Sequence, residues 1–382
     1  MSKILGIIGG GQLGMMITEA AKKMPENISK VIVLDPTENC PAYQVGAEQI
    51  IADFKDEKAI QELAEKSDII TYEIESGNSD VLKSVESKAE INPSPETLRT
   101  IQDKFLQKTF LSENNIPVAD FIKIESIDDL KKGLENFGYP ALLKARRDAY
   151  DGRGNYKINS PEEVQTAFEY FKGQKLMLEK FIPFKMEVSV IAARNTNGQI
   201  KTYPLVENIH ENNILRETIA PARVTEKVLE KSENIAKDTM TVLKGAGVFG
   251  IEMFVTQDDE ILINEIAPRV HNSGHHTLQS SETSQFEQHL RAILGLELGS
   301  INLIHPTIMY NILGTKDFVG EYKPIEIIDE KVFLKMYGKK ISKPSRKLGH
   351  FNLVGQKGES VEVLLEKLSK IIPKIQFTPL DH

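Results

Sequence analysis

The stretch GIEMFVTQDDEILINEIAPRVHNSGHHT, residues 250–277, contains two apolar runs separated by the turn Gln257-Asp258-Asp259. This pattern predicts two neighbouring β-strands in an antiparallel hairpin. Glu252 lies in the first strand and Glu265 in the second, so we expect the two carboxylates, with Asn264 beside them, to face each other. Hard oxygen ligands of this kind suit Mg²⁺, which takes one or two carboxylates and completes its shell with phosphate and water. The hairpin therefore predicts a sheet that carries a magnesium and phosphate site.

Three polar residues after the second strand extend this site. Arg269, His271 and Asn272 offer donors for an anion beside the two carboxylates. A purely structural explanation stays open, in which buried acids of a sheet pair with Arg269.

A zinc site is another interpretation of the same segment. His271 and His275 are close enough in sequence to share a metal ion, and His276 follows them. Ser273-Gly274 disfavours a regular helix between them, and Cys40, the single cysteine of the chain, is far away in sequence. The pattern therefore favours magnesium over zinc.

The segments on either side of the hairpin predict an α+β architecture. Long alternating strands between residues 188 and 265 predict a largely antiparallel sheet, with one helix at about 225–244. Short strands and two helices, at about 127–137 and 161–172, predict a compact piece between residues 117 and 179. After Pro306 a smaller module is expected, with strands near 307–313, 332–336 and 351–354 and a last helix near 360–371.

The first hundred residues alternate between strand-like and helix-like segments. Strand patterns cover 4–8, 31–34, 50–52 and 68–72, and helical patterns cover 12–24, 57–66 and 79–88, which predicts a parallel α/β sheet. Pro93 and Pro95 end this unit. Ser94 is placed to cap one helix with apolar residues at Leu98, Ile101, Phe105 and Leu106, and a domain boundary is expected near Asp103.

The glycine-rich segment IIGGGQLGMM, residues 7–16, follows the first strand and opens a helix. Gly9, Gly11 and Gly14 fit the G-x-G-x-x-G pattern of a dinucleotide site, and Asp35 ends the next strand where such a site holds a ribose hydroxyl. A tight turn from a strand into a helix needs glycines for steric reasons alone. Both explanations stay open at this point.

Two central segments carry further candidates for a nucleotide site. In PALLKARRDAYDGRGNYKI, residues 140–158, Lys144 closes a strand and a loop with Gly152 and Gly154 follows, so backbone N–H groups and an ammonium group can meet phosphate oxygens. The alternative is a solvated hairpin. In LMLEKFIPFKMEVSV, residues 176–190, Glu179 and Glu187 flank a bend and offer carboxylates to a ribose, unless they are exposed acids of a sheet.

Basic residues gather in KMYGKKISKPSRKLGH, residues 335–350. Such a cluster is either a solvated face or the phosphate anchor of an acidic small substrate. Its members are Lys335, Lys339, Lys340, Lys343, Arg346, Lys347 and His350.

The bulk properties set limits on the class of protein. A chain of 382 residues is too long for one hydrophobic core, so two or three domains are expected. The net charge of −8 argues against a protein that grips a nucleic-acid backbone. No apolar stretch has the length of a membrane span, Cys40 has no partner for an internal disulfide, and no leader segment is evident. We therefore expect a cytoplasmic enzyme or binding protein.

NEIAPRVHNSGHH (264–276), taken with YDGRG (150–154) and IIGGGQLGMM (7–16), resembles the ATP-grasp superfamily. Within this superfamily the chain is similar to the 5-(carboxyamino)imidazole ribonucleotide synthases, the PurK type of purine biosynthesis. The resemblance covers essentially the whole chain. The resemblance implies α/β and α+β parts in three domains. These are an N-terminal parallel α/β pre-ATP-grasp domain (1–103), a two-lobed ATP-grasp domain (104–300) with a mobile sublobe at about 112–180, and a small β-rich C-terminal domain (301–382).

The resemblance also implies a reaction. ATP, bicarbonate and 5-aminoimidazole ribonucleotide (AIR) would give the N-carboxylated nucleotide, ADP and phosphate through carboxyphosphate. It implies Mg²⁺, with Mn²⁺ as a substitute, ATP as co-substrate and no NAD, in a homodimer with neither nucleic acid nor membrane as partner. The alternatives are another ATP-grasp ligase, such as a formate-dependent glycinamide ribonucleotide transformylase or a biotin carboxylase, an NAD-dependent dehydrogenase, and a regulatory nucleotide-binding protein.

Site residues carry over from the resemblance position by position. It implies ATP contacts from Lys104, Lys144, Ala149, Tyr150, Asp151, Gly152, Arg153, Gly154, Asn155, Glu179, Lys180, Phe181, Ile182, Glu187, His210, Asn264 and Glu265. It implies metal ligands at Glu252 and Glu265, and a catalytic set of Arg269, His271, Asn272, Asp151 and Tyr150. It implies substrate contacts from Glu73, Lys339, Arg346, Gly11, Gln12 and Leu13.

The phosphate loop departs from the usual family pattern at three positions. Asp148-Ala149 precede Tyr150 where two glycines are common, and Asn155 ends the loop in place of glutamine. Lys104 stands where arginine is frequent, which changes a bidentate phosphate contact into a single-point one.

Overall fold

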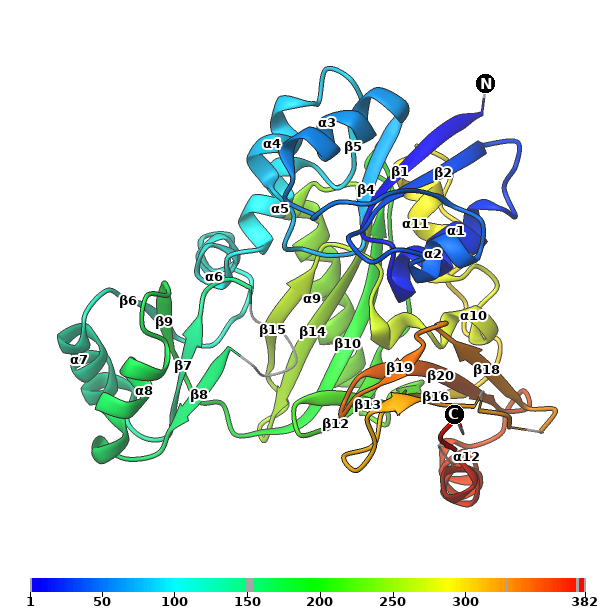
Figure 1. Ribbon diagram of the computed structural model, residues 1–382. Coiled ribbons are helices and arrows are strands. Elements are labelled where there is room, and N and C mark those ends of the chain that lie inside the picture. Colours follow the sequence, from blue (N-terminus) through cyan, green and yellow to red (C-terminus); the bar gives the residue numbers. More distant parts are fainter. Residues whose placement is uncertain (1, 149–153, 324, 328, 376–377, 381–382) are drawn as a thin grey trace.

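The computed structural model describes residues 2–148, 154–323, 325–327, 329–375 and 378–380 (Figure 1). Three sheets carry most of the architecture, and a two-stranded ribbon supplements them. Within the described residues, no helix is both long enough and apolar enough to cross a membrane.

The N-terminal sheet is parallel, as predicted, with strand order β3-β2-β1-β4-β5. Four of its strands match predicted ones, while the short β5 was not predicted. The strands are β1 (Lys3–Ile8), β2 (Ile28–Leu34), β3 (Glu48–Ile50), β4 (Ile69–Tyr72) and β5 (Glu90–Ile91), and the helices are α1 (Gln12–Ala21), α2 (Pro41–Gln44), α3 (Glu57–Lys66) and α4 (Ser79–Ser84).

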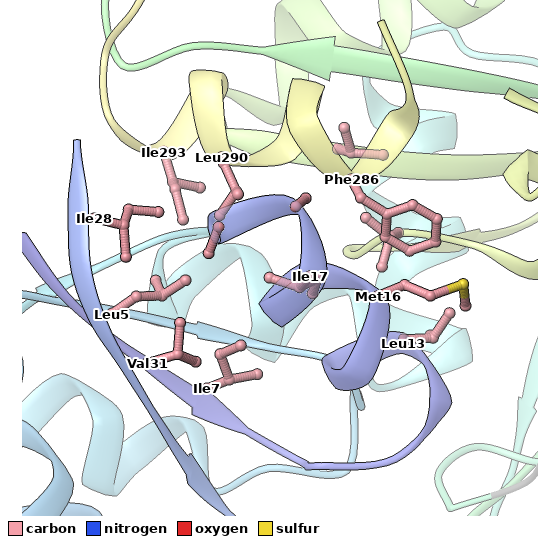
Figure 2. Close-up of a cluster of buried hydrophobic side chains, with 14 of the residues drawn as sticks. Leu5, Ile7, Leu13, Met16, Ile17, Ile28, Val31, Phe286, Leu290 and Ile293 are labelled. Carbon is pink, nitrogen blue, oxygen red and sulfur yellow. The ribbon is translucent and has the colours of Figure 1, made fainter. Parts of the chain in front are cut away.

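Helix α1 joins the N-terminal sheet to the rest of the molecule. Its buried side chains, among them Met16 and Ile17, lie between the sheet residues Leu5 and Ile7 and the helix α11 (Gln285–Ile293) (Figure 2). Both parts contribute side chains to one hydrophobic cluster, so the N-terminal unit packs directly against the ATP-grasp region.

The connection after the N-terminal sheet consists of two helices, although the sequence predicts one. Ser94 caps α5 (Pro95–Ile101) as predicted, and Asp103 caps a separate α6 (Lys104–Glu113). The break has a local cause, because the Asp103 carboxylate accepts hydrogen bonds from the backbone N–H groups of Phe105 and Leu106 and starts a new helix.

The small lobe is a four-stranded antiparallel sheet in the order β6-β9-β7-β8 with its own hydrophobic core. Its helices lie at both predicted places, although the second starts as a 3₁₀ turn. The elements are β6 (Phe121–Ile124), α7 (Ile127–Phe137), β7 (Ala141–Ala145), β8 (Asn155–Ile158), η1 (Pro161–Glu163), α8 (Val164–Tyr170) and β9 (Leu176–Lys180).

The large sheet is antiparallel and runs β15-β14-β10-β12-β13-β16-β20-β18, with β11 beside β10. Its strands are β10 (Phe184–Arg194), β11 (Ile200–Thr202), β12 (Val206–Glu211), β13 (Ile214–Ala220), β14 (Gly247–Thr256), β15 (Ile261–Ala267), β16 (Thr307–Leu313), β18 (Val332–Met336) and β20 (Lys347–Val354). Since β13 pairs with β16, the sheet continues across residue 300, where the sequence analysis places a domain boundary.

The remaining elements cover or edge this sheet. They are α9 (Glu226–Leu243), η2 (Asn272–Gly274), α10 (Thr277–Ser280), α12 (Val361–Ile371), η3 (Ile372–Lys374) and the ribbon of β17 (Gly320–Glu321) with β19 (Ile341–Ser342). The N-terminal unit and the small lobe lie on different sides of the large sheet (Figure 1).

Candidate active site

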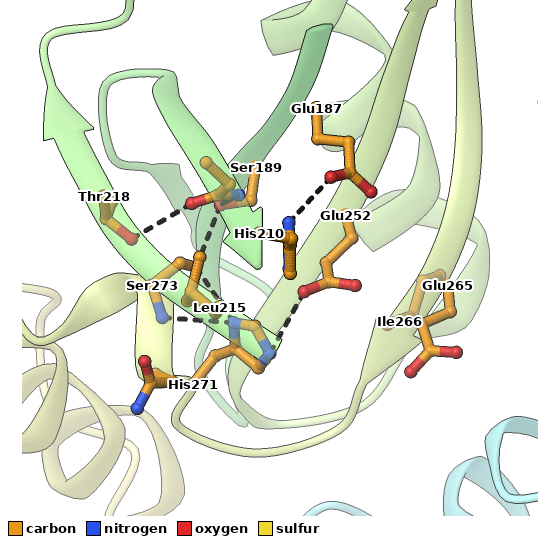
Figure 3. A network of polar contacts seen from close by, with 12 residues as sticks. Glu187, Ser189, His210, Leu215, Thr218, Glu252, Glu265, Ile266, His271 and Ser273 are labelled. Atoms are coloured by element: carbon orange, nitrogen blue, oxygen red, sulfur yellow. Dashed lines mark hydrogen bonds and ion pairs between the residues drawn. The ribbon is translucent and has the colours of Figure 1, made fainter. Parts of the chain in front are cut away.

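The acid pair lies on the hairpin of β14 and β15. Glu252 is directly opposite Glu265 in the strand register, which confirms the pairing predicted from the sequence (Figure 3). The register shifts by one residue after this pair, so Asn264 is the extra residue of a β-bulge. Bulges re-aim side chains next to binding sites.

The electrostatics of the acid pair favour a bound cation. Burial and the nearby charge of Glu265 raise the pKa of Glu252 to about 7. Burial acts on Glu265 in the same direction, but its ion pair with Lys104 outweighs burial and lowers the pKa of Glu265. Two partly buried carboxylates with too little positive charge around them fit a divalent cation such as Mg²⁺.

His271 extends from the turn after β15 toward the same pair. Its Nε2 lies 3.4 Å from Oε1 of Glu252, and its Nδ1 lies 2.9 Å from the hydroxyl of Ser273. Burial and the nearby charge of Arg269 lower the pKa of His271 to about 3. The ring is therefore neutral at physiological pH.

Arg269 lines a cavity of about 610 Å³ between the N-terminal unit and the ATP-grasp region. Its guanidinium is held by both carboxylate oxygens of Glu75, with Nη2 3.2 Å from Oε1. Lys104, Glu265 and Lys347 line the same cavity. The predicted anion site therefore faces an open volume.

Lys144 and Glu179 meet inside the small lobe. Glu179 is 1% exposed, and its two oxygens lie 2.7 Å from Nζ of Lys144 and 2.8 Å from Nζ of Lys108. Burial raises the pKa of Glu179, but Lys144 and Lys108 outweigh it and bring the pKa to about 2. The carboxylate of Glu179 is paired with these two ammonium groups. Its predicted contact with ATP stays a prediction.

Glu187 and His210 form a second polar pair on the face of the large sheet. Glu187 Oε2 lies 2.7 Å from His210 Nδ1, and the two side chains come from the neighbouring strands β10 and β12 (Figure 3). Burial lowers the pKa of His210, but Glu187 outweighs this effect and the pKa is raised. This pair lies beside Glu252.

Asn272 is tied down by a reciprocal amide pair. Its Oδ1 accepts from Asn311 Nδ2 at 2.5 Å, and its Nδ2 donates to Asn311 Oδ1 at 3.2 Å. Asn311 also donates to the carbonyl oxygen of Leu215, so strand β16 orients Asn272.

The glycine-rich turn is filled by the chain's own carboxylates. Glu73 accepts hydrogen bonds from the N–H groups of Gly11 and Gly14, the latter at 2.6 Å, and Asp35 accepts one from Gly10 at 2.8 Å. Gly9 has φ +98° and packs against Glu73, where a Cβ atom would clash. The donors that a dinucleotide pyrophosphate would need are thus already used, so the sterics of the turn explain its glycines.

The basic C-terminal segment reaches back to the N-terminal helix. Lys339 donates from Nζ to Gln12 Oε1 and to the carbonyl oxygen of Lys347, both at 2.8 Å. Arg346 donates to the carbonyl oxygen of Ile341 at 2.8 Å. Gln12 and Lys339, predicted as substrate contacts from opposite ends of the chain, are therefore neighbours.

Several predicted residues have other positions. Ala149, Tyr150, Asp151, Gly152 and Arg153 lie outside the described residues. Gly154 precedes β8, and Asn155 pairs with Lys144 across β7 and β8. Lys180 ends β9, Phe181 and Ile182 follow it, and Leu13 is buried in the core around α1. Their roles stay predictions.

The zinc interpretation finds no support. His276 Nδ1 lies 2.7 Å from the hydroxyl of Ser280, and His275 Nδ1 lies 3.2 Å from Gln285. In the part of the chain that the structure describes, no group of three or more His, Cys, Asp or Glu side chains is arranged to hold a metal ion.

Three residues that contact predicted site residues were not predicted from the sequence. They are Lys108, Glu75 and Asn311. Lys108 lies one helical turn after Lys104, and this spacing places both on neighbouring positions of α6. Glu75 lies two residues after Glu73, beyond the same strand end. Asn311 had no local signal, since only the pairing of β13 with β16 brings it near Asn272.

Comparison with known proteins divides the chain into three matched regions. Residues 1–102 match the ribonucleotide synthetase preATP-grasp domain, residues 109–286 the ATP-grasp domain, and residues 307–363 the phosphoribosylaminoimidazole carboxylase C-terminal domain. The three-domain ATP-grasp fold expected from the sequence is thereby confirmed.

Relatives and solved structures agree with this division. A phosphoribosylaminoimidazole carboxylase of Schizosaccharomyces pombe is 42% identical over 94% of this chain, which spans only 66% of that relative's length. The N5-carboxyaminoimidazole ribonucleotide synthase of Bacillus subtilis is 40% identical over 92% of both chains.

Two solved structures resemble the whole chain. The N5-carboxyaminoimidazole ribonucleotide synthetase of Thermotoga maritima superposes with a TM-score of 0.88, 42% identity and coverage of 99% of this chain and 100% of the other. The Aspergillus clavatus N5-carboxyaminoimidazole synthase, in complex with ADP and 5-aminoimidazole ribonucleotide, gives 0.87 at 34% identity and covers 98% of this chain and 99% of that one. The chain belongs to the N5-carboxyaminoimidazole ribonucleotide synthase family.

Proposed function

We propose that this protein carboxylates AIR at its exocyclic amine, with ATP and bicarbonate as co-substrates and ADP and phosphate as products. The observation that carries the proposal is the acid pair of Glu252 and Glu265, because Glu265 pairs with Lys104 and lines the same cavity as Arg269. The relatives named for this activity, and the related structure with ADP and AIR, support the choice of acceptor over formate-using or biotin-carboxylating ligases.

The proposed chemistry has two steps. A bicarbonate oxygen attacks the γ-phosphorus of ATP, the bond from that phosphorus to the β–γ bridging oxygen breaks, and ADP leaves with the electron pair. The amine nitrogen of AIR then bonds to the carboxyl carbon of carboxyphosphate, or to the CO₂ released from it. The carbon–oxygen bond to phosphate breaks, the departing phosphate keeps the electron pair, and the amine proton passes to that phosphate.

The side chains supply charge at defined places in this scheme. Lys104 and Lys144 bind phosphoryl oxygens, and Arg269, released from Glu75, binds bicarbonate in two-point fashion. Glu252 and Glu265 would hold Mg²⁺, which when bound neutralises the charge on the phosphates. His271 and Asn272 stay close to the acid pair and orient the anion.

We propose that the substrate nucleotide binds where the start of α1 meets the basic segment 335–350. Lys339 and Arg346 bind its phosphate, with Gly11, Gln12 and Leu13 at the start of α1 beside it. Glu73 supports this turn from below through its bonds to Gly11 and Gly14.

The decisive assay measures ADP release with Mg²⁺ and bicarbonate while the acceptor is varied. We expect AIR to stimulate release, and glycinamide ribonucleotide with formate, or biotin, to have no effect. Strong stimulation by either alternative, or an absorbance change with NADH, would refute the proposal.

Glu265→Gln tests the metal assignment. Because the amide binds a divalent cation poorly, we expect kcat/KM to fall by about 10²-fold or more, corresponding to about 3 kcal/mol. Glu260→Gln is the matched control, since Glu260 lies on the same hairpin in an exposed pair with Lys231 and should leave kcat/KM unchanged. Circular dichroism should show the same fold for both variants.

We also propose that the protein acts as a homodimer in the cytoplasm, as the family resemblance implies. Light scattering coupled to gel filtration measures the mass directly. A mass of about one 42.9 kDa chain would contradict the dimer.

A further inference from the structure

A buried row of polar side chains crosses three strands of the large sheet behind the acid pair. The Thr218 hydroxyl on β13 donates to Asn208 Oδ1 on β12 at 3.1 Å, and Asn208 Nδ2 donates to the Ser189 hydroxyl on β10 at 2.8 Å. Thr218 and Ser189 are fully buried. A buried polar group without a hydrogen-bond partner lowers the stability of the fold. Each side chain of this row is bonded to the next, so the row forms one connected network.

The row continues out of the sheet to His271. Ser189 donates to the hydroxyl oxygen of Ser273 at 2.9 Å, and Ser273 Oγ lies 2.9 Å from His271 Nδ1 (Figure 3). On the far side of the ring, Nε2 is 3.4 Å from Glu252 Oε1. The network therefore ends at the predicted metal pair.

The direction of the hydrogen bonds defines which ring nitrogen carries the proton. The backbone N–H of Ser273, which can only donate, points at His271 Nδ1 at 3.4 Å. Because Ser189 donates to Ser273 Oγ, the hydroxyl proton of Ser273 is free to point at Nδ1 as well. Both contacts make Nδ1 an acceptor.

We propose that Thr218, Asn208, Ser189 and Ser273 are positioning residues that keep the His271 proton on Nε2, where it donates to Glu252. This donor engages Oε1, one of the two carboxylate oxygens of Glu252. Hydrogen bonds of this type to a ligating carboxylate orient it and strengthen metal binding. The effect on Mg²⁺ rests on the proposed function, whereas the proton position does not.

A second buried histidine–serine pair provides a matched control. His276 Nδ1 lies 2.7 Å from the Ser280 hydroxyl, and both residues are fully buried, as are His271's partners Ser189 and Ser273. Within the part of the chain that the structure describes, His276 has no hydrogen bond or ion pair with an acid of the site. Ser280→Ala therefore removes a similar contact without touching the row that ends at Glu252.

The experiment uses full-length, metal-free protein with ¹⁵N-labelled histidine, and two-bond ¹H–¹⁵N correlation spectra assign the ring tautomers. In the unmodified protein we expect His271 as the Nε2–H form, with Nδ1 unprotonated, between pH 6.5 and 8. This measurement needs no variant, so it stays decisive if a substitution prevents folding. A His271 ring with its proton on Nδ1 overturns the proposal.

The variants test the row itself. Ser273→Ala should shift the two ring-nitrogen signals of His271 toward those of a tautomer mixture, and Ser189→Ala should do so to a smaller extent. Ser280→Ala should leave them unchanged. Unchanged His271 signals in Ser273→Ala overturn the proposal.

Metal binding gives the second readout. With ADP present, we expect the Mg²⁺ dissociation constant to rise about tenfold in Ser273→Ala and to change less than twofold in Ser280→Ala. An equal rise in both variants overturns the link to Glu252. If the ring signals behave as expected but no variant or unmodified protein binds Mg²⁺, the proposed function fails and the tautomer assignment stands.

Discussion

Glu179, which is a predicted ATP contact, has a structural role in the small lobe. Its carboxylate is buried between the ammonium groups of Lys108 and Lys144, each within 2.8 Å. Burial lowers the pKa of Lys108, since the charged form is disfavoured away from water. Removing the carboxylate would leave two positive charges facing each other inside the small lobe.

Glu179→Gln is therefore expected to destabilise the protein at pH 7 by about 3–5 kcal/mol, as for other buried pairs that lose one partner. Urea unfolding followed by circular dichroism measures this difference. Asp120→Asn is the control, because the pair of Asp120 and Lys180 is exposed at 3.2 Å and should contribute less than about 1 kcal/mol.

The same carboxylate makes a pH-dependent contribution with a defined sign. The pKa of Glu179 is about 2 in the folded protein and 4.5 as its ordinary value, so its stabilisation is present above pH 4.5 and is lost as pH falls toward 2. Between pH 7 and 3.5 the protein should lose about 1.4 kcal/mol that Glu179→Gln does not lose. A constant difference between the two proteins over this range would contradict the assignment.

The pairing of the two acids on the hairpin could be predicted from the sequence, but the residues that contact the predicted site residues could not. Glu252 and Glu265 were found because alternating strands and a short turn place them opposite each other. Ser189 contacts Ser273, and Asn311 contacts Asn272. Both are small polar residues inside apolar strands, and nothing in their local sequence separates them from ordinary sheet residues. Their partners follow only from the strand order of the large sheet.

The joint between α5 and α6 illustrates the element scale. Asp103 caps α6 through the N–H groups of Phe105 and Leu106 and also accepts two hydrogen bonds from Arg146, at 2.9 and 2.8 Å. Burial raises its pKa, but Arg146 and the capped N–H groups outweigh burial and lower it. One carboxylate thus ends a connector, starts a helix and anchors the end of β7.

Substitutions at Asp103 should separate these duties. Asp103→Asn keeps a capping oxygen but leaves Arg146 unpaired, so we expect a loss of about 3 kcal/mol. Asp103→Ala also removes the cap and should lose about 1 kcal/mol more. Urea unfolding of both variants measures the two steps.

Asp56 is the matched control for this pair of variants. It caps α3 by accepting from the N–H of Ala59 at 2.8 Å, and among the described residues it has no ion pair with an arginine. Asp56→Asn should change the free energy of unfolding by a few tenths of a kcal/mol and Asp56→Ala by about 1 kcal/mol. A small effect of Asp103→Asn, like that of Asp56→Asn, would show that the Arg146 pair contributes little.

Elements were predictable where periodicity was long and less so where one residue decides. The β14–β15 hairpin and helix α9 follow from sustained apolar patterns, and both lie close to their predicted ranges. The bulge at Asn264 has no periodic signal, because one extra residue leaves the apolar pattern almost intact. The break before α6 was missed because apolar residues continue through it.

On the scale of the whole molecule, the sheet and the cores cross the sequence boundaries. Strand β13 pairs with β16, and Ile219 of β13 is buried in the same cluster as Ile308 of β16 and Leu364 of α12. The parallel and antiparallel regions were predictable from local patterns. Their continuity was not, since pairing between distant strands depends on the assembled fold and not on either segment alone.

Lys339 belongs to the proposed phosphate anchor and contacts Gln12 of the N-terminal unit, so it tests how these two distant parts of the sequence are arranged. Lys339→Met removes the ammonium group that reaches Gln12, and we expect KM for AIR to rise about 10–100-fold, the loss of about 1.5–3 kcal/mol for one charged hydrogen bond. KM for ATP should change less than twofold, because ATP is assigned to Lys104 of α6 and Lys144 of β7.

Lys340→Met is the control, since Lys340 is the exposed neighbour on the same segment and carries the same charge. If the effect of Lys339→Met came from net charge alone, both variants would raise KM for AIR equally, and the ionic-strength dependence of KM would change in both. A specific contact predicts an effect in Lys339→Met only. A rise in KM for ATP instead of AIR would show that the basic segment binds ATP, and would contradict its proposed contact with the phosphate of AIR.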